Sequence, residues 1–115
     1  MAFDKPIGEY ESVRTWRDGL KEQWGEEPDM ATRLETLGGF CDFAGTDPDT
    51  MIAECTRVVE SGKRIRIKAR REYNEKIAEF QASARVTARE QVKAGNVVRS
   101  FFIHNGIFMQ AGLSV

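Results

Sequence analysis

Apolar residues recur at steps of three and four along most of the chain, a spacing that predicts α-helices with one buried face. In residues 9–23 the recurring positions are Val13, Trp16 and Leu20. A second stretch, residues 29–45, repeats the spacing with Met30, Leu34, Leu37, Cys41 and Ala44. The N-terminal part of the chain is therefore expected to form two amphipathic helices.

The predicted helix over residues 29–45 has recognisable ends and an unusual interior. Asp29 is placed to cap it, because an aspartate oxygen accepts a hydrogen bond from a free backbone N–H of the first turn. Gly45 ends it, because glycine adopts the left-handed conformation without strain. Gly38 and Gly39 lie inside it, where each costs about 1 kcal/mol relative to alanine. Their presence indicates the close approach of a packed helix or a partner.

A third helix is predicted to begin at Thr46–Asp49, with Asp47 or Thr46 as its cap and Pro48 in its first turn, where a missing N–H is tolerated. Its expected apolar face consists of Met51, Ile52, Cys55, Val58 and Val59. The segment Ser61–Lys63 is expected to end it.

Two further helices are predicted over residues 66–83 and 86–104. The second is expected to bury Val97, Val98, Phe101 and Phe102 and to end at Asn105–Gly106. No segment shows sustained alternation, and the one β-like stretch, Arg64–Lys68, is short. The sequence therefore predicts an all-α fold, a four-helix bundle with a short leading N-terminal helix. The domain is expected over residues 9–107, between an N-terminal tail (1–8) and a tail or linker start (108–115).

The formal net charge of −1 conceals a strong asymmetry along the chain. Residues 1–56 contain 5 Lys/Arg and 13 Asp/Glu, whereas residues 57–115 contain 12 Lys/Arg and 5 Asp/Glu. A basic half binds phosphates even when the whole chain is nearly neutral. The charge pattern thus indicates a nucleic-acid partner for the C-terminal half.

The residue pattern gives no support to several functional classes. No apolar run reaches the length of a membrane span and no signal peptide opens the chain, so a cytoplasmic location is expected. Cys41 and Cys55 lie on predicted apolar faces without metal-ligand spacing and are expected to be reduced core thiols. The single histidine, His104, ends a helix, where it suits the helix dipole. No catalytic motif accompanies it, so we expect no enzyme activity, no cofactor, no metal and no small-molecule substrate.

The last predicted helix carries a strip of hydrogen-bond donors opposite its apolar side. At about 100° per residue, the members fall within roughly a quarter-turn of one another. They are Arg85, Arg89, Lys93, Asn96 and Ser100. Solvated helix faces usually mix both charge signs, but this strip contains no carboxylate. It suits phosphate and base-edge contacts; a hydrated face that lacks acids is the alternative.

The most basic segment, Lys63–Arg71, permits two interpretations. Part of it can pair with glutamates at helical spacing, as in the pairs Lys68–Glu72 and Arg71–Glu75. The remaining cations, Lys63, Arg64 and Arg66, have no such partners in the sequence. They are candidates for contacts with the phosphate backbone.

Three segments resemble, in order and spacing, the core-binding domain of tyrosine recombinases, the phage-integrase type. They are Trp16–Leu20, Leu37–Ile52 and Val97–Ile107. The family shows a leading Trp-containing helix, a helix ending in Phe-x-x-Phe before a Gly-x-x-Pro turn, and a helix closing with Arg-Ser-Phe-Phe. The resemblance spans about residues 10–110 and implies a SAM-like helical bundle that clamps one side of double-stranded DNA. A separate domain performs catalysis in that family, so this chain would be a non-catalytic part of a protein for DNA integration and recombination.

The resemblance also implies which residues contact DNA, because the family presents its first and last bundle helices to the major groove. On matching positions these are Thr32, Thr36, Arg89, Lys93 and Asn96, in agreement with the donor strip. Two positions depart from the family pattern. Asp29 replaces the usual Ser or Thr cap, and Glu35 lies on the presumed DNA face. Other recombinase protomers on the same DNA are a further partner that the resemblance allows.

Two other functions stay open. A helical protein-interaction module would use the acidic N-terminal half of the chain. A helix-turn-helix transcription regulator would use the short Gly45–Asp47 connection between two helices. The helix after that connection carries Asp49, Glu54 and Glu60, which suit a recognition helix poorly.

Overall fold

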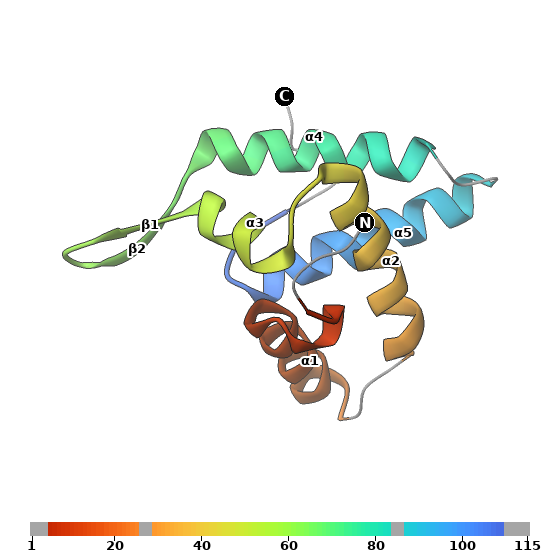
Figure 1. Ribbon diagram of the computed structural model, residues 1–115, viewed down its shortest axis with the longest axis horizontal. Helices are drawn as coiled ribbons and strands as arrows, with labels where there is room; N and C mark the ends of the chain where they lie inside the picture. The colour runs from red at the N-terminus through yellow and green to blue at the C-terminus, as the bar shows by residue number, and fades with distance from the viewer. Residues whose placement is uncertain (1–4, 26–28, 84–86, 110–115) are drawn as a thin grey trace.

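The computed structural model describes residues 5–25, 29–83 and 87–109, which are mostly helical. The helical elements are η1 (Ile7–Glu9), α1 (Glu11–Trp24), α2 (Met30–Ala44), α3 (Pro48–Cys55), α4 (Ile67–Ser83) and α5 (Ala88–His104). Two strands, β1 (Thr56–Val59) and β2 (Gly62–Ile65), pair antiparallel between α3 and α4. Figure 1 shows α4 and α5 crossing the molecule together, with α1 below them and α2 running from below α5 up toward α4. The largely helical fold and the helices over residues 9–23, 29–45 and 66–83 are thus confirmed.

Helix α5 lies at the centre of the core and packs against α1, α2 and α4. The expected burial of Val97, Val98, Phe101 and Phe102 is confirmed. The Phe101 ring meets the fully buried Trp16 edge to face, with centroids 5.7 Å apart. Trp16 also donates its indole N–H to the hydroxyl of Ser100 at 3.0 Å, which satisfies the one polar group it buries.

The ends of α2 only partly follow the sequence prediction. Gly45 ends the helix at φ +76°, as expected. Asp29 precedes the helix at φ +49°, and its side chain makes no capping hydrogen bond, so the predicted cap is wrong. In the left-handed conformation the carboxylate does not point at the free N–H groups, whereas a capping residue is normally extended. Asp47, at the start of α3, does cap, accepting from Thr50 N at 2.7 Å.

The two glycines inside α2 have different surroundings. A Cβ at Gly39 would lie 3.6 Å from the Phe80 ring of α4, so this glycine contacts a packed aromatic side chain. A Cβ at Gly38 would meet nothing within 4 Å. The expected close approach therefore occurs at Gly39, with a neighbouring side chain rather than a backbone.

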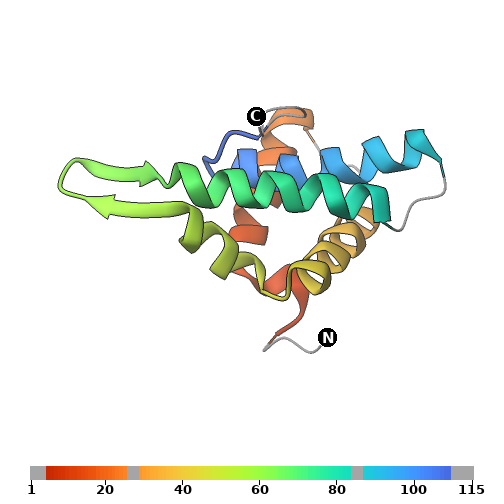
Figure 2. The ribbon, with the colours of Figure 1, turned by 90° about the horizontal axis from the view of Figure 1, so that it is seen from above.

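The segment after Cys55 is a hairpin, which corrects the prediction of a continuous helix through Val59. Arg66 N donates to Cys55 O at 2.7 Å, and the strands pair in the register Thr56–Ile65 and Val59–Gly62. The β-branched residues of this segment favour extended backbone, and Gly62 takes φ +129°, a conformation that side chains rarely allow. Val58 is therefore 81% exposed instead of forming a helix face. Figure 2 shows the hairpin projecting beyond the helices.

The chain stays packed past the end of α5, although residues 108–115 were expected to form a tail. Gly106 turns the backbone at φ +88°, as the predicted Asn105–Gly106 stop requires. The next residue, Ile107, is fully buried, and Met109 is 2% exposed. At the other end of the chain, η1 contacts α2, so residues 7–8 also belong to the packed body. Residues 110–115 and the predicted helix start at Val86 lie outside the described residues.

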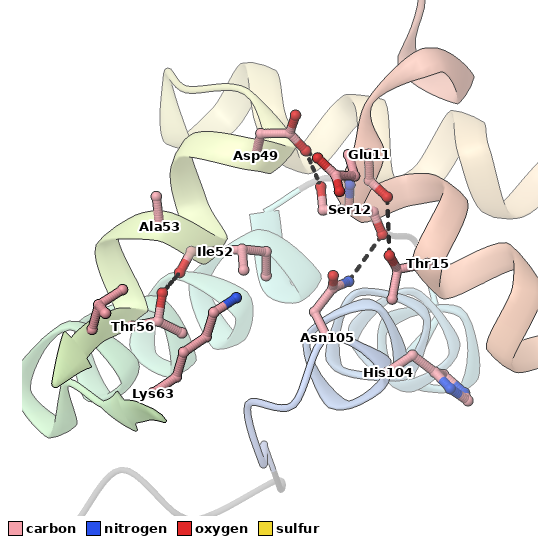
Figure 3. A pocket seen from close by; sticks show the side chains of 11 residues that line it. Glu11, Ser12, Thr15, Asp49, Ile52, Ala53, Thr56, Lys63, His104 and Asn105 are labelled. Atoms are coloured by element: carbon pink, nitrogen blue, oxygen red, sulfur yellow. Dashed lines mark hydrogen bonds between the residues drawn. The ribbon is translucent and has the colours of Figure 1, made fainter. Parts of the chain in front are cut away.

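A polar cluster joins the start of α1 to α3 and the end of α5 (Figure 3). Asp49 accepts from Ser12 N at 2.9 Å and from the Ser12 hydroxyl at 2.6 Å, so it caps α1 from another helix. Asn105 donates to Ser12 O at 3.0 Å. Partial burial alone would raise the pKa of the Asp49 carboxyl, but the hydrogen bonds from Ser12 outweigh it and hold this pKa below its usual range. The Asp49 carboxylate is thus held in place by the fold.

Replacing Asp49 with alanine is expected to lower the free energy of unfolding by about 1 kcal/mol at pH 7, the usual size of a lost cap. Because the folded pKa is depressed, the contribution of Asp49 is present above its unfolded value of 3.8 and is lost as the pH falls through the folded value. Urea unfolding of both proteins at pH 7 and near pH 2 measures this. A stability difference that stays unchanged in acid would contradict the assignment.

Candidate nucleic-acid interface

A groove runs between α2 and α5 and contains most of the residues predicted to bind DNA. It consists of two adjoining hollows that share Thr32, Lys93 and Val97. The predicted contacts that line it are Thr32, Thr36, Arg89, Lys93 and Asn96. These residues come from distant parts of the sequence, and the packing of α2 on α5 brings them together.

The donor side chains of α5 face outward because the opposite side of the helix is in the core. Arg89, Lys93 and Asn96 are exposed, whereas Ala94 and Val98 are buried. Thr87 caps the helix at this end: its hydroxyl oxygen accepts from Glu90 N at 3.1 Å. The two cations therefore lie in the first turns of a well-formed helix, accessible to a ligand in the groove.

The predicted strip is shorter than expected at its C-terminal end. Ser100 is half-buried, and its hydroxyl oxygen accepts the indole N–H of Trp16, so it belongs to the contact between α1 and α5. This corrects its assignment to an exposed strip. Arg85 lies outside the described residues.

Charge is divided unequally along the groove. One hollow contains three cations, Arg33, Arg89 and Lys93, against Asp29 alone. The other contains Lys93 with three carboxylates, which belong to Glu35, Asp42 and Glu90. A phosphate is therefore attracted to the first hollow and repelled by the far end of the second.

Arg33 is a groove residue that the sequence analysis missed. It follows Thr32 directly and lines the same hollow as Arg89 and Lys93. Its position next to a predicted contact on α2 was the available signal. Only the packing of α2 against α5 distinguishes it from an ordinary solvated arginine.

The remaining predicted contacts lie away from the groove. Lys63 and Arg64 are on β2 and Arg66 follows it, so all three are at the hairpin end of the molecule, opposite the start of α5 (Figure 1). The longest extent of the molecule is 45 Å. The structure thus separates the hairpin cations from the groove cations. All of these cations are exposed except Arg33, which is half-buried.

The hairpin cations differ in their electrostatic surroundings. Lys63 lines a hollow with Glu11 and Asp49, labelled in Figure 3. Arg66 lines another hollow with Glu54 and Glu72. These carboxylates weaken the positive potential around both cations.

Arg64 stands directly opposite Arg57 in the strand pairing, and both are exposed. Like charges in directly opposite positions destabilise a hairpin. Arg57, which the sequence analysis placed in a helix, is therefore a second cation beside a predicted contact.

The two cysteines are buried in the core, as predicted, and are not reactive groups. Burial, with Asp42 and Asp47 adding negative charge nearby, raises the pKa of the Cys41 thiol to about 12. Burial, with a contribution from Glu54, likewise raises the pKa of the Cys55 thiol to about 12. Both stay protonated at neutral pH, so neither is a nucleophile or a ready metal ligand.

Comparisons with known proteins and searches for metal sites or membrane-spanning helices do not assign a function. Within residues 5–25, 29–83 and 87–109, no group of three or more His, Cys, Asp or Glu side chains is placed to hold a metal ion. None of the described helices is long and apolar enough to cross a membrane. No protein-family model matches the chain, and searches of curated proteins and of solved structures return no match. The arrangement of the groove residues is therefore the main evidence on function.

Proposed function

We propose that this chain is a non-catalytic domain that binds double-stranded DNA, of the core-binding type found in tyrosine recombinases. One observation carries the proposal. The sequence predicts DNA contacts on two separate helices, and these residues, among them Thr32, Arg89 and Lys93, line one groove. The two cations, Arg89 and Lys93, are exposed. An exposed row of donors on a helix is the arrangement that phosphate and base-edge contacts need.

In the proposed complex the first turns of α5 contact the duplex backbone. Arg89 and Lys93 neutralise phosphates, and Asn96 donates from its amide. The N-terminal end of α5 adds the partial positive charge of a helix dipole. The carboxylates at the acidic end of the groove repel the DNA backbone, which therefore lies closer to the hollow that Arg33, Arg89 and Lys93 line.

The α2 wall supplies a different kind of contact. The Thr36 hydroxyl donates to Thr32 O at 3.0 Å, so toward a ligand Thr36 only accepts. An acceptor does not suit phosphate oxygens but suits the amino groups of adenine and cytosine in the major groove. Thr36 is thus proposed as a base contact, and Arg89 and Lys93 as backbone contacts.

The proposal includes a SAM-like bundle and a separate catalytic domain in the parent protein, as the resemblance implies. The β1–β2 hairpin lies between α3 and α4 as an addition to the helices of such a bundle. The cations at the hairpin, Lys63, Arg64 and Arg66, are proposed to contact a second part of the same duplex. A duplex along the 45 Å extent of the molecule would reach both ends, since about 13 base pairs span that length at 3.4 Å each. The domain then functions in DNA integration and recombination, with other protomers bound nearby.

The first test is a titration of the whole chain with a 25-base-pair duplex at several salt concentrations. We expect the logarithm of the binding constant to fall linearly with the logarithm of salt, by about 0.9 per neutralised phosphate. Three cations in the basic hollow predict a slope of about 3, and hairpin contacts make it steeper. Absence of binding at the lowest salt, or binding with a flat salt dependence, would contradict the proposal.

A protein-interaction module is the second candidate, and the acidic end of the groove favours it. Glu35, Asp42 and Glu90 line the same hollow as Phe43, which is 44% exposed and contacts the Phe80 ring. An exposed apolar side chain in a hollow with three carboxylates suits a basic, partly apolar peptide. Weak DNA binding that barely depends on salt would favour this function.

The helix-turn-helix alternative is less well supported. Its recognition helix would be α3, which buries Pro48, Met51 and Cys55 in the core. Of the two acids of α3, Asp49 is tied to Ser12 and Glu54 is exposed, where it would repel DNA phosphates. A stable dimer on palindromic DNA in gel filtration would revive this alternative.

A further inference from the structure

Arg99 is a buried cation for which the described structure provides only neutral partners. Its side chain is 7% exposed. One terminal N–H donates to Asn96 Oδ1 at 3.2 Å and another to Gln81 Oε1 at 3.0 Å, while Nε has no partner. Burial lowers the pKa of the guanidinium, and no described carboxylate contacts it. A buried charge held only by amides destabilises a fold, so packing alone does not account for it.

The backbone beside Arg99 is shaped to accept this arrangement. A Cβ at Gly95 would lie 1.9 Å from Gln81 Oε1 and 2.8 Å from the nearest terminal nitrogen of Arg99. Because residue 95 has no side chain, the ends of the Gln81 and Arg99 side chains occupy the space where a Cβ would lie. A glycine inside a helix is itself unfavourable, so two unfavourable features coincide at one place.

Next to Arg99 is a hollow between the end of α1 and α5 that is lined by donors. Its polar lining consists of Gln23, Asn96, Arg99, Ser100 and His104, and none of its described lining residues is acidic. Asn96 Oδ1 accepts from Arg99, which fixes the amide so that its N–H groups are left for a ligand. Because Ser100 accepts from Trp16, its own hydroxyl hydrogen is available for donation.

We propose that this hollow binds a phosphate group and that Arg99 provides its charge. The ligand is a backbone phosphate of the duplex bound along α5, so the inference rests on the proposed function. Asn96 lines both this hollow and the basic end of the groove. Arg89 and Lys93 contact phosphates along α5, and the pocket therefore adds one more phosphate contact on the side toward α1.

The test uses Gln81→Glu, which supplies a carboxylate behind Arg99. Gln81 is not among the lining residues of the hollow, so the substitution leaves the pocket wall unchanged. A carboxylate at its position, 3.0 Å from the guanidinium, pairs with the buried charge. We expect a higher melting temperature, a DNA affinity lower by about tenfold, and a salt slope smaller by about 0.9.

Ala82→Glu is the matched control, because it adds the same charge one residue along α4 on the exposed side. Arg99→Met is the second variant: it removes the charge outright and should also reduce the salt slope without lowering the melting temperature. If Gln81→Glu and Ala82→Glu bind DNA with equal affinity and equal slope, the pocket inference is wrong while the proposed function stands.

Inorganic phosphate separates failure of the pocket from failure of the proposed function. The probe is the NMR signal of the Trp16 indole N–H, which donates to Ser100 at the edge of the hollow. A shift on phosphate addition that is absent in Gln81→Glu supports the pocket even if the chain binds no duplex. No shift in the unmodified chain would overturn it.

Discussion

Replacing both Arg89 and Lys93 with alanine is expected to weaken binding to a DNA duplex by about 100-fold at low salt, since each charge-assisted contact contributes about tenfold or more. The salt slope should fall by about 1.8, because two phosphates are no longer neutralised. Both side chains are exposed, so the melting temperature should hardly change. Fluorescence anisotropy with a labelled duplex measures affinity and slope, and calorimetry measures melting.

The matched control removes the same amount of charge elsewhere. Lys68→Ala with Arg71→Ala changes two exposed cations on α4, away from the groove, and should leave the slope unchanged. A third variant, Lys63→Ala with Arg64→Ala, reports whether the duplex also reaches the hairpin. Equal losses in all three variants would mean that binding follows net charge, and the groove would lose its special role.

Replacing both Ile107 and Met109 with alanine is expected to lower the free energy of unfolding by about 4 kcal/mol or more, because each large-to-small core change costs about 2–5 kcal/mol. The two side chains are 0% and 2% exposed, although they follow the last helix. A loss of this size is a large part of the stability of a small domain. Urea unfolding followed by circular dichroism gives the midpoint and the slope from which the loss is obtained.

Phe108 provides the control within the same segment. It lies between the two buried residues and is 55% exposed, so Phe108→Ala should change stability by less than about 0.5 kcal/mol. A loss at Phe108 equal to that at its neighbours would show that the segment is not packed in this register. A negligible loss for the double variant would restore the interpretation of a tail.

The helices could be predicted because their signals are local. Spacing of apolar residues, Pro48 in a first turn and the glycines at 45 and 106 act within a few residues, so each element follows from its own segment. The hairpin was missed because Val58 and Val59 continue the helical spacing of α3. Only the pairing of Arg57 with Arg64 and Val58 with Lys63 reveals that the segment is extended.

The sequence predicted several residues of the candidate groove but not where the groove ends. Helical spacing placed Arg89, Lys93 and Asn96 on one face, and the structure keeps them exposed. The same spacing included Ser100, which is directed to Trp16 by the packing of α1. Arg33 and the acidic end of the groove became apparent only from the approach of α2 to α5.

What the sequence by itself determined is the set of helices, most of their buried faces and the charge difference between the two halves of the chain, since these depend on residue type and short-range spacing. The tertiary structure alone decided which surfaces meet. It buried Ile107 and Met109, turned Asp49 into a cap for α1, and enclosed Arg99 between neutral amides. The physical reason is that burial and electrostatic environment depend on neighbours that are distant in sequence, and no local pattern specifies which neighbours these are.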